Sequence, residues 1–238
     1  MTKRATPNTP ERLATFVTHR LRRAAVPADA PIMQAYMKTE MPYFGVKKPG
    51  LVPIFREMKR RFAPQSRREY EAGIRALWQL DHREQKYAAL EYASQHPAWI
   101  TPKSLPLYER LVREGAWWDL VDNLVSGVIS PLYLDQRKTL RPTINRWIDD
   151  EHLWVRRAAL LAHLKHKEQT DQRQLFRHCL RRADEREFFI RKAIGWALRQ
   201  YSYVEPQAVR TFLLEHQDRL SGLSYREGAK VLVRRGQM

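Results

Sequence analysis

The chain of 238 residues has a single cysteine, Cys179, and therefore cannot form an intramolecular disulfide. Cys179 lies in an apolar helical pattern, where we expect it to be a small core residue. No apolar run approaches the roughly 20 residues that span a bilayer. The first ten residues, MTKRATPNTP, have no apolar segment of the signal-peptide kind. These absences predict a soluble, cytoplasmic protein that acts without a membrane.

Several kinds of site have no counterpart in the sequence. There is no glycine-rich phosphate loop of the P-loop or Rossmann kind. His163 and His166 lie close together in LAHLKH, but no cysteines or carboxylates accompany them at metal-ligand spacing. We therefore expect no metal and no organic cofactor.

Acidic residues are scarce relative to basic ones. The chain has 43 Lys and Arg against 26 Asp and Glu, a formal net charge of +17. Such an excess creates a positive field whose usual partners are nucleic acid, an anionic membrane or an acidic protein. The charge favours nucleic acid among these three.

Helical periodicity dominates the chain, and no alternating strand pattern is present. The segment PERLATFVTHRL, for example, places Leu13, Phe16, Val17 and Leu21 on one face of a helix. Prolines fall mostly between such segments. The pattern predicts an all-α fold with a disordered tail over residues 1–12 and a single helical-repeat domain over residues 13–238.

Short copies of one pattern recur every 35 residues. VRRAAL at 155–160 resembles IRKAIG at 190–195, with weaker copies at 85–90, 120–125 and 225–230. A fixed period of this length is typical of stacked helical pairs. We therefore predict a HEAT-like α-solenoid with a concave basic binding face. Asp122, Arg157 and Lys192 occupy the same place in three successive copies and should lie along one face.

Two helical segments combine tryptophan with charge. Trp118 and Asp122 in WWDLVDN are spaced i, i+4 and share a helix face, whereas Trp117 and Val121 can point toward the core. Lys192, Trp196 and Arg199 follow i, i+4, i+7 on another helix. Burial in the core is an equally good account of a lone tryptophan. Tryptophan among cations suits nucleic acid, because cations meet phosphates and the ring meets sugar or base faces.

At these positions the sequence resembles the HEAT-like-repeat alkylpurine DNA glycosylases, the AlkD type of DNA alkylation repair enzyme. The resemblance covers nearly the whole chain, from about residue 31 to about residue 230. It rests on WWDLVD at 117–122, WVRRAAL at 154–160, EFFIRKAIGW at 187–196, and YMK at 36–38 with FGVK at 44–47.

The resemblance implies roles for particular residues. Asp122 matches the family's catalytic carboxylate, and Trp118 and Trp196 match an aromatic pair that lies against the sugar and backbone of the damaged nucleotide. Arg157 matches a cation of the DNA-facing cleft, and Tyr36 a further residue on the DNA side. Lys192 and Arg199 are added as DNA-binding residues because they share a helix face with Trp196.

The implied reaction suits these residue types. Alkylation at N3 or N7 makes a purine formally positive and weakens its glycosidic bond. Departure of the base leaves positive charge on the deoxyribose, which a carboxylate stabilises while it orients the attacking water. The expected function is therefore excision of N3- and N7-alkylated purines from double-stranded DNA by a monomeric, monofunctional glycosylase.

Two other functions remain open at this point. A non-catalytic relative would bind damaged or branched DNA through the same basic face, but it would gain nothing from a carboxylate near phosphates. A protein-binding HEAT scaffold would not need a net charge of +17. Release of methylated base from treated DNA separates the three.

Overall fold

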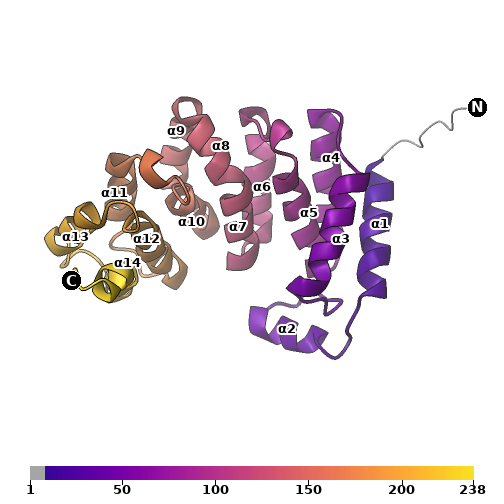
Figure 1. Cartoon of the computed structure of the whole chain (residues 1–238), viewed down its shortest axis with the longest axis horizontal. Helices are drawn as coiled ribbons and strands as arrows, with labels where there is room; N and C mark the ends of the chain where they lie inside the picture. Colours follow the sequence, from indigo (N-terminus) through magenta and orange to yellow (C-terminus); the bar gives the residue numbers. More distant parts are fainter. Residues whose placement is uncertain (1–8) are drawn as a thin grey trace, which may run out of the picture. The chain divides into compact units, whose positions relative to one another are not determined.

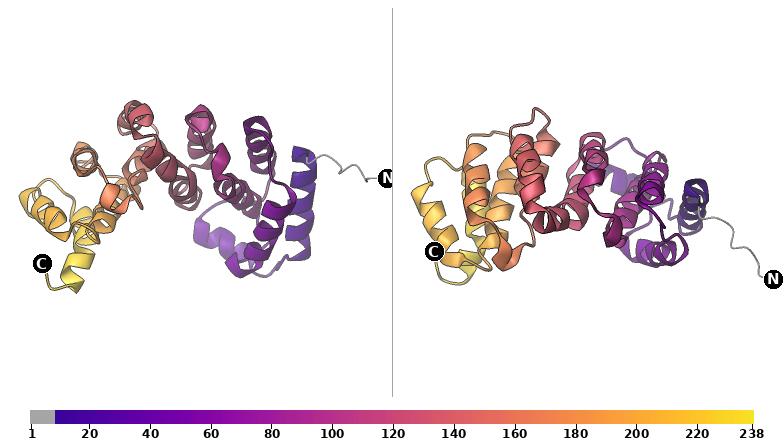
Figure 2. Two further views of the ribbon diagram at one scale, coloured as in Figure 1. Left: turned by 45° about the horizontal axis from the view of Figure 1, so that its top comes forward. Right: turned by 90° about the horizontal axis from the view of Figure 1, so that it is seen from above.

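All regular structure in the part of the chain that the structure describes is helical. A computed structural model describes residues 9–238 (Figure 1). Figure 2 shows helices and their connections from two other sides, with no strand among these residues. The predicted all-α class is confirmed. The chain forms two compact units, the first ending at Thr101 and the second running from Pro102 to Met238, where the sequence predicts a single domain.

The first unit begins with a helix that is capped at its first turn. Thr9 accepts a hydrogen bond from the backbone N–H of Arg12, and Pro10 occupies the first helical position, where its missing N–H has no cost. The predicted tail over residues 1–12 lies mostly outside the described residues, but residues 10–12 are helical. The helices of this unit are α1 (Pro10–Arg23), α2 (Ala30–Met37), α3 (Lys48–Arg61), α4 (Arg67–Trp78), α5 (Arg83–Gln95) and the short 3-10 helix η1 (Pro97–Trp99).

A buried carboxylate orders the segment that leads into α3. Glu84 is fully buried and accepts hydrogen bonds from the backbone N–H groups of Phe44, Gly45 and Val46 at 3.1, 2.8 and 3.0 Å. Gly45 has a φ of +82°, and a Cβ there would lie 2.1 Å from the carbonyl oxygen of Val26. Only glycine fits this position, which explains the glycine of FGVK.

The second unit contains the remaining helices. Its first residues form a short 3-10 helix, and a π-helical turn follows α7 directly. Its elements are η2 (Pro102–Ser104), α6 (Leu105–Gly115), α7 (Trp118–Leu124), the π-helical turn η3 (Val125–Ile129), α8 (Ser130–Asp135), α9 (Arg137–Trp147), α10 (Leu153–Leu161), η4 (Lys167–Gln169), α11 (Gln172–Arg181), α12 (Phe188–Tyr201), α13 (Pro206–Glu215) and α14 (Gly222–Arg234).

The 35-residue register coincides with contacts between successive helices of the second unit. Asp122 of α7 pairs with Arg157 of α10 at 2.7 Å, and Lys192 of α12 pairs with Glu227 of α14 at 2.8 Å. In each pair the second residue lies 35 residues after the first. Two pairs of positions that are equivalent in the 35-residue register are therefore in contact within this unit.

Helices α12 and α14 pack closely because of a glycine. A Cβ on Gly195 would lie 2.4 Å from the Cβ of Glu227 and 2.8 Å from the carbonyl oxygen of Ser224. The core of this unit also contains Trp147 and Cys179, both fully buried, so the prediction for Cys179 is confirmed. None of the helices over residues 9–238 is both long and apolar enough to cross a membrane.

Candidate active site

A tight turn between α6 and α7 sends two adjacent tryptophans in different directions. Ala116 ends α6 with a left-handed backbone (φ +36°), and its N–H donates to the carbonyl of Val112. Trp117 is extended and caps α7, so its ring packs against Trp154 and Phe189 with centroid separations of 5.9 and 5.5 Å. Trp118 begins the helix and turns away from that cluster. The expected inward position of Trp117 agrees with this packing.

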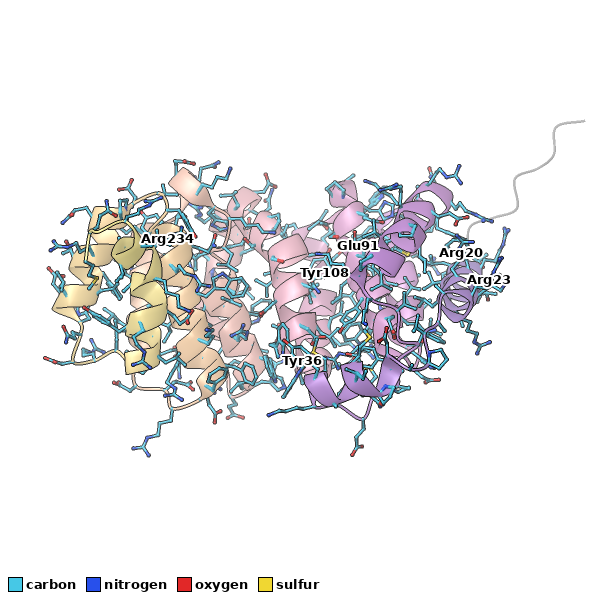
Figure 3. All side chains as sticks on the ribbon, turned by 60° about the horizontal axis from the view of Figure 1, so that its bottom comes forward. Arg20, Arg23, Tyr36, Glu91, Tyr108 and Arg234 are labelled. Carbon is cyan, nitrogen blue, oxygen red and sulfur yellow. The ribbon has the colours of Figure 1, made fainter. Side chains whose placement is uncertain are left out.

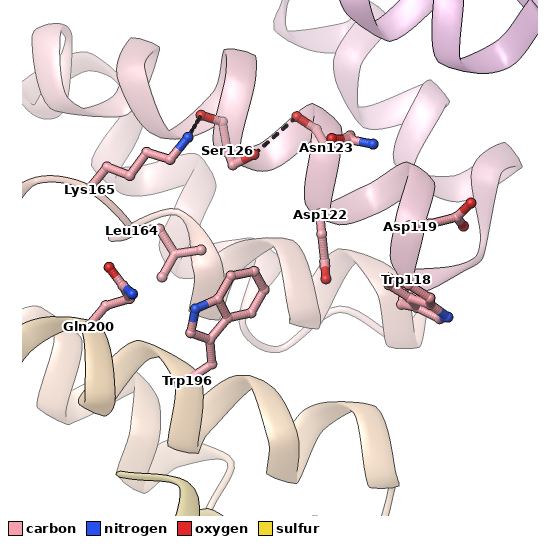
Figure 4. Close-up of a pocket in the computed structure, with 9 residues that line it drawn as sticks. All are labelled: Trp118, Asp119, Asp122, Asn123, Ser126, Leu164, Lys165, Trp196 and Gln200. Carbon is pink, nitrogen blue, oxygen red and sulfur yellow. Dashed lines mark hydrogen bonds between the residues drawn. The ribbon is translucent and has the colours of Figure 1, made fainter. Parts of the chain in front are cut away.

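Trp118 forms one side of a hollow of about 330 Å³ in the second unit, and Trp196 lies across from it (Figure 4). Both tryptophans are half-buried. The carboxylate of Asp122 points into the space between them. The lining residues come from α7, the π-helical turn, the segment after α10, and α12; they are Trp118, Asp119, Asp122, Asn123, Ser126, Leu164, Lys165, Trp196 and Gln200.

Arg157 holds Asp122 in place from behind. Its Nε and Nη2 donate to the two carboxylate oxygens at 2.8 and 2.7 Å, and its Nη1 donates to the carbonyl of Phe189 at 2.6 Å. Such a bidentate pair fixes the plane of the carboxylate as well as its position. The Arg157 side chain is only 4% exposed, whereas that of Asp122 is 15% exposed. The structure thus places Arg157 beneath the carboxylate rather than on the open surface.

Burial and pairing act on the Asp122 carboxyl in opposite directions. Burial raises its pKa above the usual value of 3.8, and the nearby charge of Asp119 acts in the same direction. The hydrogen bonds and positive charge of Arg157 oppose this rise. The result is a carboxylate with restricted access to water, aimed at an opening between two aromatic faces. Such a group stabilises positive charge better than one in bulk water, because the local dielectric is low.

A π-helical turn follows α7 and widens the backbone next to Asp122. Val125–Ile129 form this turn, and Ser126 lies within it. Single π-helical turns are frequent at functional sites, because they displace side chains from the regular helical positions. Here the turn brings Ser126 to the edge of the hollow beside Lys165, whose ammonium lies 3.4 Å from the Ser126 carbonyl.

None of the four predicted DNA-binding residues, Arg157, Tyr36, Lys192 and Arg199, lines this hollow. Lys192 and Arg199 both bind Glu227 of α14, at 2.8 and 2.7 Å, with 37% and 25% of their side chains exposed. Tyr36 belongs to α2 of the first unit, where Figure 3 labels it, and its side chain is far from the core, because the residue is 73% exposed. The residues that the structure brings together at the hollow are Trp118, Asp122 and Trp196, with Arg157 behind them.

Sequence reasoning missed four polar lining residues: Asn123, Ser126, Lys165 and Gln200. Asp119, next to Trp118 in the sequence, also lines the hollow and is 6% exposed. The i, i+4 spacing from Trp196 to Gln200 was a usable signal for that residue. Over the described residues, no group of three or more His, Cys, Asp or Glu is arranged to hold a metal ion.

The fold and the hollow define a strongly basic, all-α protein in which a paired carboxylate faces an opening between two tryptophans. The family profile described as DNA alkylation repair enzyme matches residues 17–232, and the chain belongs to that family. A solved structure described as a predicted DNA alkylation repair enzyme from Enterococcus faecalis is similar, with 30% identity and a TM-score of 0.81 over 88% of this chain and 97% of the other. No curated protein matches the chain significantly.

Proposed function

We propose that this DNA alkylation repair enzyme is a monofunctional DNA glycosylase that excises N3- and N7-alkylated purines from duplex DNA. The observation that carries the proposal is the position of Asp122. Its carboxylate is fixed by two hydrogen bonds from a buried arginine and points into a hollow between two tryptophans.

The proposed reaction breaks the bond between C1′ of the deoxyribose and N9 of the purine. The bonding electron pair leaves with the base, which neutralises the positive charge created by alkylation. Positive charge develops on the sugar, and the Asp122 carboxylate stabilises it. The faces of Trp118 and Trp196 favour the same cation. Water then attacks C1′ and loses a proton, which yields free alkylpurine and an abasic site.

Arg157 acts in this scheme as a positioning residue. With both carboxylate oxygens engaged at 2.8 and 2.7 Å, Asp122 has a fixed orientation before the DNA binds. The guanidinium also favours the ionised carboxylate against the effect of burial. This role replaces a direct phosphate contact, because the Arg157 side chain is almost inaccessible to a ligand.

The wider binding surface remains a prediction. We propose that Tyr36, Lys192 and Arg199 contact the DNA beyond the damaged nucleotide, and that the protein acts as a monomer. Lys192 keeps over a third of its side chain exposed despite its bond to Glu227, which leaves it accessible to a phosphate. The HEAT-like solenoid with a concave basic face rests on the 35-residue period and on the net charge of +17.

The direct test is to incubate the purified protein with duplex DNA treated with a methylating agent and to separate the released bases by chromatography. The proposal predicts free N3-methyladenine and N7-methylguanine, with abasic sites left in unbroken strands. Binding of the DNA without release of either base would instead support the non-catalytic alternative.

A further inference from the structure

The segment after α10 has an unusual backbone. Lys165 and Lys167 have φ angles of +64° and +50°, in the left-handed region that residues with a Cβ rarely adopt. Two such lysines within three residues form a strained turn over 164–167, which we call the lysine turn. Strain of this kind persists only where the surrounding structure imposes it, and it is found most often at functional sites.

Buried polar groups impose this backbone. The Nε2 of His166 lies 3.0 Å from the carbonyl oxygen of Ser130, and the hydroxyl of Ser130 donates to the carbonyl of Leu164. One turn earlier, His163 lies 3.2 Å from His178. Leu164 and His166 are 3% and 2% exposed. The lysine turn is therefore anchored on both sides of Lys165.

Of the two lysines in the anchored turn, Lys165 lines the hollow and Lys167 does not. Lys165 is exposed, lines the hollow with Asp122 and Trp196, and extends along its edge toward Ser126 (Figure 4). Its contact with the Ser126 carbonyl, at 3.4 Å, is at the weak limit of a hydrogen bond. The two oxygens of Asp122 are already occupied by Arg157. The Lys165 ammonium is thus held at the site and available to an anionic ligand.

We propose that Lys165 binds a phosphate of the DNA strand that carries the damaged nucleotide, next to the sugar that faces Asp122. This inference rests on the proposed function. A sugar between Trp118 and Trp196 brings its flanking phosphates close to the carboxylates of Asp119 and Asp122, which repel them. A compact ammonium at the edge of the same hollow offsets that repulsion and fixes the position of the strand. The strained turn holds the ammonium in this position.

The chain offers a matched control in Lys167. It lies in the same turn, is exposed and has a similar backbone, but it does not line the hollow. We expect Lys165→Gln to weaken binding to a duplex with a tetrahydrofuran abasic analogue by about tenfold at low salt. The slope of log K against log salt should fall by about 0.9, the value for one phosphate. Lys167→Gln should change the affinity and the slope much less.

Replacing single DNA phosphates by neutral methylphosphonates shows which phosphate Lys165 contacts. Duplexes are made with a methylphosphonate at each of the two positions that flank the abasic analogue. At one position the wild-type affinity should fall to that of Lys165→Gln, and the variant should show no further loss. If neither position shows this coupling, or if Lys165→Gln binds with the wild-type affinity and salt slope, the proposal is wrong.

Replacement by glycine separates binding from folding. Lys165→Gly removes the ammonium but relieves the left-handed strain, so the protein should melt at the wild-type temperature or above it and bind as weakly as Lys165→Gln. A lower melting temperature that accounts for the lost binding would mean that Lys165 is structural. Because the abasic duplex is not cleaved, these results do not depend on glycosylase activity, and absence of base release would count against the proposed function only.

Discussion

Arg157 and Asp122 form a pair in which the arginine controls the charge of the carboxylate. Burial raises the pKa of Asp122, and Arg157 limits the rise. In the proposed reaction the ionised form is the active one, so excision should be retained above this pKa and lost as the pH falls through it. Arg157→Met removes the opposing charge, so the acid limb of the profile of kcat/KM against pH should move to higher pH.

The same variant distinguishes positioning from phosphate contact. Because the Arg157 side chain is 4% exposed, Arg157→Met should leave the salt dependence of DNA binding unchanged. It should also lower the free energy of unfolding by about 3–5 kcal/mol, since a buried carboxylate loses its partner. An unchanged acid limb with a smaller salt slope would instead favour the direct DNA contact that the resemblance implies.

The tryptophans of the hollow can be compared with a tryptophan of the core. Trp147 is fully buried, whereas Trp118 and Trp196 are half-buried. Trp147→Ala should lower the free energy of unfolding by about 3–5 kcal/mol. Trp118→Ala and Trp196→Ala should cost clearly less and yet slow excision in protein that is fully folded. Urea unfolding and single-turnover assays of the three variants check this. Equal stability losses in all three would assign Trp118 and Trp196 to the core.

At the scale of the helix, the position of Trp196 depends on how α12 packs on α14. Gly195 permits the close approach, since a Cβ there would lie 2.4 Å from Glu227 and 2.8 Å from a backbone oxygen. Gly195→Ala should therefore lower the free energy of unfolding by about 1–3 kcal/mol and slow excision by displacing Trp196.

Gly222 is the control for this change. It belongs to α14, but a Cβ there would meet only the flexible end of Arg226. Gly222→Ala should leave the free energy of unfolding and the excision rate close to the wild-type values. If thermal unfolding of the two variants is the same, the packing of α12 on α14 does not depend on Gly195.

The sequence predicted the helices and the shared face of Trp118 and Asp122 because both follow from the helical period. It also placed Asp122 and Arg157 in register. It could not show that the two bind each other, because a period of 35 residues does not specify side-chain direction. Lys165 was missed for another reason, since a left-handed lysine has no local sequence signal and is imposed by buried contacts to another segment.

At the scale of the whole molecule, buried histidines should make stability depend on pH. Burial lowers the pKa of His166 and of His178 to about 4, and that of fully buried His163 well below 6.5. Unfolded histidines bind protons below about pH 6.5. The free energy of unfolding should thus have its full value above that pH and should decrease as the pH drops toward 4.

The loss should be on the order of a few kcal/mol over this window. Urea unfolding at a series of pH values measures it, and His178→Gln should make the dependence shallower. A free energy of unfolding that stays constant between about pH 6.5 and about pH 4 would contradict the neutral, buried state of these histidines.

The central claim is that the charge of Asp122 drives base release, and single-turnover excision of N7-methylguanine by Asp122→Asn tests it most directly. The change keeps the shape of the side chain and removes its charge, so the rate should fall by about 10²–10³. The control is Asp184→Asn, which removes the same charge at an exposed position between α11 and α12. This variant should excise at the wild-type rate. Asp119 is unsuitable as a control because it lines the same hollow. Excision by folded Asp122→Asn at the wild-type rate would contradict the account.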